Sequence, residues 1–219
     1  MDITDEREDS AMNEFDKDYW EDQWGDATSG RKRQLPVNPY LTAEAAHLPV
    51  GTALDAGCGT GTEALWLAEQ GWDVTAADIS STALAEAKSR AATSGVGERV
   101  DWVETDLSRW QPGRTWDLVV TSYAHAQIGQ LPLYRRIASW VAPGGTLLIV
   151  GHLDGGHAHD VRHGHDHPHG ATATLEGITN LFGSPGWRID SAYEQVRTVH
   201  PGGSPMQLRD VIVRAHRLT

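Results

Sequence analysis

Many apolar residues in this chain fall into short continuous runs. In several of the stretches between these runs, the apolar residues are instead three or four positions apart. Such runs favour buried strands, whereas apolar residues three and four apart favour helices that cover a sheet. Strands are expected at 52–57, 72–78, 100–105, 116–123, 146–150, 187–196 and 208–216. Helices are expected at 38–48, 62–70, 81–93, 131–141 and 173–182. The alternation predicts a three-layer α/β domain with a seven-stranded, mostly parallel sheet whose last strand is antiparallel.

Length and charge set the expected domain organisation. With 219 residues, 39% of them hydrophobic, the chain is long enough for one α/β domain. The net charge is −12, and residues 1–26 hold eleven Asp and Glu against two basic residues. Residues 1–17 bury too little apolar surface to offset their ordering entropy, which predicts a disordered acidic arm. The remaining residues, 18–219, form the single domain, with 18–50 as an N-terminal cap and 151–170 as a histidine-rich loop.

The charge pattern also limits the partners. Outside the acidic arm the body is nearly neutral and has no basic stripe, so we expect no nucleic-acid partner. No apolar run is long enough to span a membrane, and no leader resembles a signal peptide, which predicts a protein without a membrane partner. A single cysteine, Cys58, excludes an internal disulfide and fits a cytoplasmic location.

Glycines cluster where the first expected strand gives way to a helix. Residues 55–61 read Asp-Ala-Gly-Cys-Gly-Thr-Gly, with glycines at Gly57, Gly59 and Gly61. Glycine permits positive φ and close approach of a ligand to the backbone, and the following helix offers unpaired N–H groups to an anion. A dinucleotide fingerprint would place its third glycine at position 62, which is Thr62, so a nicotinamide-dependent oxidoreductase is disfavoured.

This glycine segment, preceded by Asp55, resembles motif I of the class I S-adenosylmethionine-dependent methyltransferases. The resemblance implies a Rossmann-like three-layer sandwich, S-adenosylmethionine as the cofactor, and a small-molecule methyl acceptor. The three glycines and Asp55 would then hold the amino-acid half of the cofactor. Its carboxylate suits helix-start N–H groups, and its ammonium suits oxygens near Asp55.

A second acidic residue, Asp78, ends the second expected strand. It lies 21 residues beyond Gly57, the separation at which a carboxylate reaches the ribose hydroxyls in nucleotide-binding α/β folds. We therefore expect Asp78, with Ile79 beside it, to bind the adenosine. The alternative is that Asp78 caps the helix that begins near Ser81, although Ser80 and Ser81 can cap that helix themselves.

The third and fourth expected strands end in further candidate residues. In the resembled family, an acidic residue at the position of Asp106 binds the adenine amino group. The backbone N–H of the next residue, here Leu107, contacts the adenine ring. The alternative is an aspartate in a surface turn. The fourth strand ends in Thr-Ser-Tyr-Ala at 121–124, where Ser122 is expected beside the cofactor. Enzymes that methylate nucleobase amino groups commonly carry Asn/Asp-Pro-Pro-Tyr/Phe here, so this departure argues against that chemistry.

His125 follows on the loop where the acceptor should arrive, and an imidazole there is a candidate general base. A structural role is the alternative for a lone histidine.

Two tryptophans precede the first strand. Trp20 and Trp24 are four residues apart and would share one face of a helix. The segment resembles the N-terminal region of the thiopurine and tellurite-resistance methyltransferases, which closes over the cofactor. That resemblance implies cofactor contacts from both tryptophans, whereas simple packing on the domain is the alternative.

Histidines recur in the glycine-rich stretch after the fifth strand. Alternate residues at His163, His165, His167 and His169 are weak candidates for binding zinc, copper or nickel. A glycine-rich run lacks the defined geometry of a structural zinc site, so we expect no metal there and an active-site loop instead.

The predicted activity is transfer of a methyl group from S-adenosylmethionine to a small acceptor by in-line displacement. The resemblance to the thiopurine and tellurite group favours a soft nucleophile, either a thiol or another chalcogen. Two alternatives stay open: O- or N-methylation of a small metabolite, and a metal-binding or metal-responsive protein that retains a cofactor fold.

Overall fold

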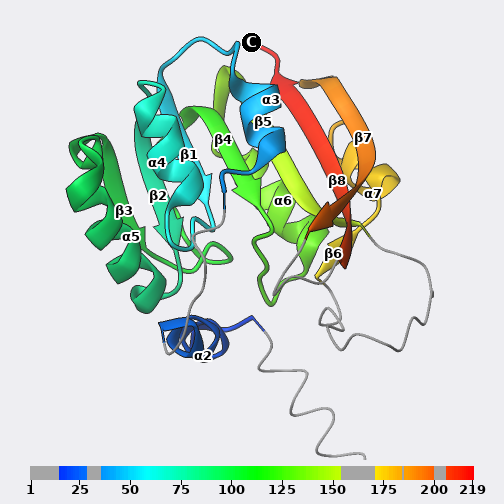
Figure 1. Cartoon of the computed structure of the whole chain (residues 1–219). Helices are drawn as coiled ribbons and strands as arrows, with labels where there is room; N and C mark the ends of the chain where they lie inside the picture. The colour runs from blue at the N-terminus through cyan, green and yellow to red at the C-terminus, as the bar shows by residue number, and fades with distance from the viewer. Residues whose placement is uncertain (1–14, 29–35, 154–170, 184, 200–205) are drawn as a thin grey trace, which may run out of the picture.

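A single mixed β-sheet forms the centre of the molecule (Figure 1). The computed structural model describes residues 15–28, 36–153, 171–183, 185–199 and 206–219. The strands are β1 (Thr52–Ala56), β2 (Asp73–Asp78), β3 (Val100–Glu104), β4 (Trp116–Ser122), β5 (Val141–Leu153), β6 (Thr172–Ala173), β7 (Trp187–Val199) and β8 (Met206–Arg217). They lie in the order β3-β2-β1-β4-β5-β8-β7, with β6 paired to β5.

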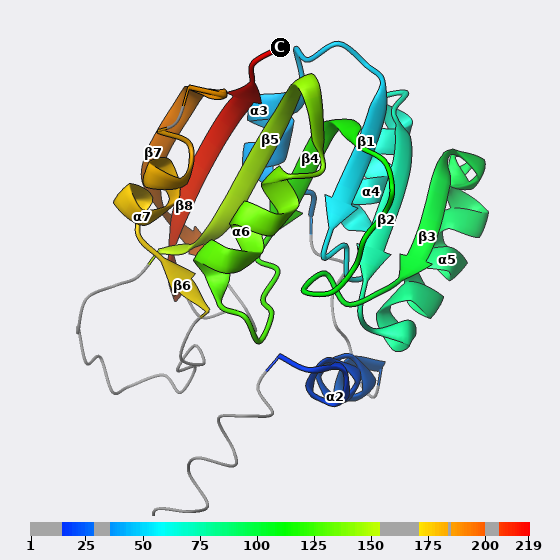
Figure 2. The same cartoon turned by 180° about the vertical axis from the view of Figure 1, so that it is seen from behind.

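Helices cover both faces of this sheet, which gives the three predicted layers (Figures 1 and 2). One face of the sheet is covered by α3 (Pro39–Ala45), α4 (Thr62–Glu69) and α5 (Ser81–Ser94). The core beneath these helices contains Ala53, Leu118 and Leu148. On the other face α6 (Gln130–Ala138) and α7 (Leu175–Leu181) pack on a second core that contains Leu54, Val119 and Leu147. A short 3₁₀ turn, η1 (Gly97–Arg99), precedes β3. The Rossmann-like architecture and the mostly parallel sheet are confirmed.

The predicted antiparallel end of the sheet is also confirmed. β8 runs antiparallel to both β5 and β7 and lies between them. The sheet has eight strands rather than seven, because Thr172 and Ala173 pair in parallel with His152 and Leu153. A two-residue strand leaves no periodic pattern in the sequence.

The boundary between the helix and strand near residue 141 differs from the prediction. α6 ends at Ala138, and β5 already begins at Val141 and includes the Pro143 to Gly145 segment. The pairing with β4 shifts there: Trp116 opposes Val141, whereas Leu118 opposes Thr146. The turn signals at Pro143 and Gly144 therefore mark a bulge within a strand.

A separate helix, α2 (Lys17–Thr28), lies across the carboxyl ends of the parallel strands (Figures 1 and 2). It includes Lys17, and Phe15 just before it is buried, so the predicted arm is too long at its C-terminal end. The rings of Tyr19 and Trp20 pack on Phe15, which explains why this residue leaves the solvent. Residues 1–14 lie outside the described part of the chain. None of the helices in the described residues is long and apolar enough to cross a membrane.

Candidate active site

The glycine turn follows β1 and leads into α4. Gly57, Gly59 and Gly61 have φ of +84°, +50° and +76°, a region that non-glycine residues rarely adopt. The turn is also crowded, because a Cβ at Gly57 would lie 2.3 Å from Cβ of Ala124. At Gly61 it would lie 2.5 Å from the ring of Trp102. The positive φ values and the close neighbouring atoms therefore both require glycine at these positions of the motif.

Asp78 holds this turn from the neighbouring strand. Its side chain is buried, and its two carboxylate oxygens accept hydrogen bonds from Gly59 N at 2.7 Å and Ser80 N at 2.9 Å. Ser80 itself caps α5, since its Oγ accepts from Ala83 N, so Asp78 is not the helix cap. Burial raises the pKa of Asp78, which the backbone N–H donors oppose. Asp78 thus joins the end of β2 to the glycine turn.

Asp55, at the end of β1, is buried with an unsatisfied carboxylate oxygen. Its Oδ2 has no hydrogen-bond partner among the described residues. Desolvation raises the pKa of Asp55 well above its usual range, and the nearby charges of Glu63 and Asp78 raise it further. A buried acceptor without a partner carries a free-energy cost that a bound cation would offset. This carboxylate therefore fits as an acceptor for the ammonium end of an amino acid.

A pocket of about 340 Å³ lies beyond the ends of β2 and β3. Ile79 and Asp106 line it, together with Phe15 and Lys17 from the N-terminal segment. Asp106 Oδ1 also accepts from Ser108 N at 2.8 Å, so this residue lines the pocket and forms the turn that was its alternative. The pocket is thus lined by two of the residues that were predicted to bind the adenosine.

Leu107 and Ser122 take different positions around this edge. Leu107 is buried, and its carbonyl accepts from Arg136 Nε at 2.8 Å. Ser122 is half-buried at the end of β4, and its Oγ accepts from Asn38 Nδ2 at 3.4 Å. Ser122 therefore ends its strand, whereas Leu107 lies in the loop after β3.

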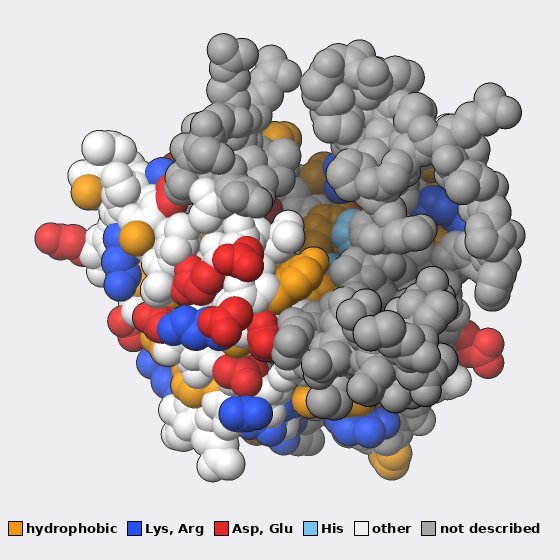
Figure 3. Space-filling model, turned by 90° about the horizontal axis from the view of Figure 1, so that it is seen from below, with side chains coloured by type: hydrophobic (Ala, Val, Ile, Leu, Met, Phe, Trp, Pro, Cys, Tyr) orange, Lys and Arg blue, Asp and Glu red, His pale blue; other side chains and the backbone are white. Residues whose placement is uncertain are grey.

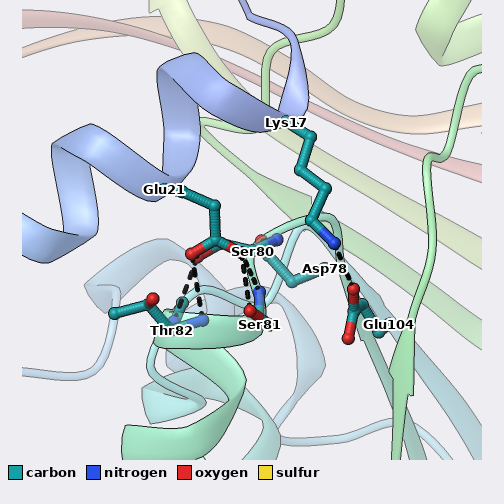
Figure 4. Close-up of polar contacts among 8 residues, drawn as sticks. Lys17, Glu21, Asp78, Ser80, Ser81, Thr82 and Glu104 are labelled. Carbon is teal, nitrogen blue, oxygen red and sulfur yellow. Dashed lines mark hydrogen bonds and ion pairs between the residues drawn. The ribbon is translucent and has the colours of Figure 1, made fainter.

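Polar contacts fix α2 over the site (Figure 4). The carboxylate of Glu21 accepts hydrogen bonds from Ser81 N at 2.6 Å and Thr82 N at 3.1 Å, as well as from the hydroxyl groups of Ser80 and Ser81. Lys17 forms an ion pair with Glu104 at the end of β3. Glu21 thus supplies a negative charge to the N-terminus of α5, directly beyond Asp78. The role of Glu21 could not be predicted from the sequence, because its hydrogen-bond partners lie about 60 positions away and no local pattern indicates them.

The two tryptophans of α2 face different parts of the site. A Cβ at Gly59 would lie 3.0 Å from the indole of Trp24, so Trp24 covers the glycine turn. Trp20 instead stacks on His125, with ring centroids 6.2 Å apart. The helix therefore spans from the predicted cofactor side to the predicted acceptor side.

Replacement of Glu21 by Gln is expected to loosen α2. Partial burial raises the pKa of Glu21, but hydrogen bonds from Thr82 and Ser81 outweigh this and bring it to about 2. Because the pKa is lowered from 4.5, the ionised contact is complete above pH 4.5 and is lost as the pH falls toward 2. Hydrogen exchange at Ser81 and Thr82 should become about tenfold faster in Glu21→Gln at pH 7.

The exposed neighbour Asp22 supplies the control. Asp22→Asn removes the same charge from α2 without touching α5, so its exchange rates should match those of the wild type. Equal exchange in Glu21→Gln and Asp22→Asn would mean that Glu21 does not anchor the helix.

Aromatic rings line the predicted acceptor side. His125 packs against Phe15 and His152 at centroid distances of 5.2 and 5.8 Å, and His152 stacks on Tyr123 at 4.6 Å. Tyr123 directly follows β4 and has a φ of +56°, an unusual value for a bulky residue. This series of rings begins beside the glycine turn, since Ala124 packs on Gly57.

The predicted base, His125, has one ring nitrogen engaged in the protein interior. Nδ1 lies 2.9 Å from Nε2 of the buried Gln130. An amide nitrogen donates hydrogen bonds, so this contact occupies the lone pair that a base would use. The geometry therefore works against the general-base role, and sequence reasoning missed Gln130.

Tyr123 is also part of a hydrogen-bond network that centres on the buried Asp210. Arg197 Nε donates to Asp210 Oδ2 at 2.6 Å, and its Nη2 donates to the Tyr123 hydroxyl at 2.9 Å. The hydroxyl of Tyr40 also donates to Asp210 Oδ2, at 3.0 Å. Asp210 is fully buried, and this network joins α3, β7 and β8 to Tyr123, the residue that follows β4.

Cys58, the only cysteine, is buried within the glycine turn. Burial raises the pKa of its thiol well above the usual range, and Asp55 and Asp78 raise it further. Cys58 is thus a small buried side chain between two glycines.

Seen from the carboxyl ends of the strands, the surface divides into two kinds of side chain (Figure 3). Acidic side chains gather on one side, where α2 carries the exposed Asp18 and Asp22. Hydrophobic side chains and a histidine lie in a hollow next to them. The described residues contain no group of His, Cys, Asp and Glu arranged to hold a metal ion. The candidates His163, His165, His167 and His169 lie outside the described ranges.

Residues 53–145, which include the glycine turn, Asp78 and Asp106, match the family model described as "Methyltransferase domain". "Probable thiol methyltransferase 2" of Arabidopsis thaliana is 29% identical over 144 residues. That match covers 64% of this chain and 63% of the Arabidopsis protein, so the chain spans less than two thirds of this relative.

Solved structures with the same fold include TehB from Haemophilus influenzae, with a TM-score of 0.68 and 16% identity over 93% of this chain and 67% of that one. Another is magnesium protoporphyrin IX methyltransferase from Synechocystis PCC 6803 with bound SAM, with a TM-score of 0.63 and 17% identity over 92% of this chain and 94% of that one. At these identities the two structures bear on the fold alone.

Proposed function

From the premise that residues 53–145 match the family model described as "Methyltransferase domain", we propose that the protein uses S-adenosylmethionine to methylate a small thiol or another soft chalcogen nucleophile. The observation that carries the choice of acceptor is the series of aromatic rings from Phe15 through His125 and His152 to Tyr123. Sulfur makes favourable contacts with aromatic rings. The thiol methyltransferase relative supports the same acceptor class.

The chain's own residues bind and orient the cofactor. When bound, S-adenosylmethionine supplies an activated methyl group on a positively charged sulfur. The Asp55 carboxylate would accept from the ammonium group, α4 would direct its N-terminus to the carboxylate, and Asp78 would accept from the ribose hydroxyls. Ile79 and Asp106 would line the adenine pocket, and Trp24 would cover the amino-acid end.

Orientation is then the main contribution to the rate. Holding the acceptor and the methyl group in line supplies up to about 7–11 kcal/mol of the barrier. A thiol loses its proton near neutral pH, whereas a hydroxyl acceptor needs a base within hydrogen-bond reach. The engaged Nδ1 of His125 therefore favours a thiol over an alcohol.

A product-mass screen with isotopically labelled S-adenosylmethionine tests this function. The panel holds a thiol, selenite, tellurite and a phenol, and labelled methyl is expected in the thiol and chalcogen products. Labelling of the phenol alone would establish O-methylation instead. No labelled product from any member, despite measured cofactor binding, would refute small-molecule methylation of these classes.

A further inference from the structure

Gln130, the first residue of α6, is buried with an exposed fraction of 4% and makes an unusual set of contacts. Its Nε2 lies 2.9 Å from Nδ1 of His125, 3.2 Å from the carbonyl oxygen of Ala124 and 3.3 Å from that of Ala171. The hydroxyl of Tyr134 is also 3.3 Å away. Its Oε1, by contrast, has no hydrogen-bond partner among the described residues.

These contacts determine which way the amide faces. Carbonyl oxygens only accept hydrogen bonds, so two of them at this distance require a donor, the amide nitrogen. Rotation of the amide by half a turn would place its oxygen against both carbonyl oxygens in a buried site, at the cost of repulsion and lost hydrogen bonds. The nitrogen therefore faces His125. Its two hydrogens cannot serve every nearby acceptor, but a hydrogen on Nδ1 would point at this amide nitrogen, which does not accept, so Nδ1 carries the lone pair.

The tautomer of His125 follows from this. A neutral imidazole carries one proton, and if Nδ1 accepts then the proton is on Nε2. Nε2 lies on the other side of the ring from the Gln130 contact. The ring itself stacks on Trp20 and packs at a tilt against Phe15.

We propose that Gln130 is a positioning residue that keeps His125 in the Nε2–H form, so that His125 donates a hydrogen bond to an acceptor that arrives as an anion. This inference rests on the proposed function. A thiolate, whose proton has already passed to water, gains a donor at Nε2. Its sulfur then forms the bond to the methyl carbon while the bond between methyl and sulfonium breaks and its electron pair stays on the leaving sulfur. An alcohol finds no proton acceptor at this nitrogen.

The first test is spectroscopic and needs no turnover. In ¹⁵N-labelled wild-type protein at about pH 8.5, two units above the usual pKa of histidine, the His125 ring should show a protonated Nε2 and a bare Nδ1. A proton on Nδ1 would overturn the proposal whether or not the protein is a methyltransferase. Added benzenethiol should shift the Nε2 resonance, and no shift at saturating thiol would overturn the donor role.

Gln130→Met keeps the length of the side chain and removes the donor. In this variant the His125 ring should lose its preference for the Nε2–H form, while the ring of His216 on β8, the internal control, keeps its spectrum. We expect kcat/KM for benzenethiol to fall about tenfold. Unchanged His125 resonances in a folded variant would show that Gln130 does not set the tautomer.

The choice between a thiol and an alcohol as methyl acceptor tests whether His125 donates to an acceptor that arrives as an anion. Wild-type protein should methylate benzenethiol and leave benzyl alcohol unmodified. Comparable rates for both would overturn the restriction to anionic acceptors. If neither is methylated, the proposed function fails for these acceptors, and the spectra still decide the tautomer.

Discussion

Asp78→Asn is expected to weaken S-adenosylmethionine binding about a hundredfold, with the fold retained. Two losses combine in this variant. The amide provides a weaker acceptor for the ribose hydroxyls than the carboxylate. It also has only one oxygen for the N–H groups of Gly59 and Ser80, so its NH₂ must face one of these donors and disturb the glycine turn. Calorimetric titration of the cofactor measures the effect.

Asp101→Asn provides a matched control, because Asp101 is exposed on the neighbouring β3. Its dissociation constant should equal that of the wild type. Unchanged affinity in Asp78→Asn would remove Asp78 from the cofactor site, and a loss of circular dichroism signal would assign it to the fold instead.

Asp210→Leu is expected to lower the free energy of unfolding by about 3 kcal/mol. The substitution removes the partner of Arg197 and the acceptor of the Tyr40 hydroxyl from a site that is fully buried at Asp210. The half-buried cation of Arg197 and the buried hydroxyl of Tyr40 are then left with fewer partners, and their desolvation is no longer offset. Urea unfolding followed by tryptophan fluorescence measures the change.

Two further variants separate the contribution of the Tyr40 hydrogen bond from that of the Arg197 ion pair. Tyr40→Phe removes one neutral hydrogen-bond donor and should cost only about 1 kcal/mol. Combining Asp210→Leu with Arg197→Met replaces the pair by apolar side chains and should recover much of the stability. If the double variant is less stable than Asp210→Leu alone, the loss comes from packing rather than from the unpaired charge.

Residues whose role follows from local backbone demands could be predicted from the sequence. The positive φ values at Gly57, Gly59 and Gly61 can be met readily only by glycine, so the pattern of glycines determined the turn. Asp78 and Asp106 could be selected as candidates because Asp78 ends β2 and Asp106 lies just beyond the end of β3, and the carboxyl ends of parallel strands meet at one edge of the sheet.

Contacts between distant segments could not be predicted in this way. Glu21 reaches the start of α5 across about 60 residues, and nothing near it in the chain distinguishes it from the exposed Asp22. Gln130 looks like an ordinary first-turn residue, and its role depends on the carbonyl of Ala171, 41 positions away. His125 could be located by its place after β4, but the direction of its hydrogen bonds depends on Gln130.

If the protein methylates thiols as proposed, the position of Cys58 has a consequence. A reactive cysteine beside the methyl donor would itself be an acceptor, and each modification would inactivate one molecule. Cys58 lies inside the glycine turn but is buried, and its raised pKa keeps it as the neutral thiol, a poor nucleophile. The protein is thereby protected from self-methylation at its single cysteine.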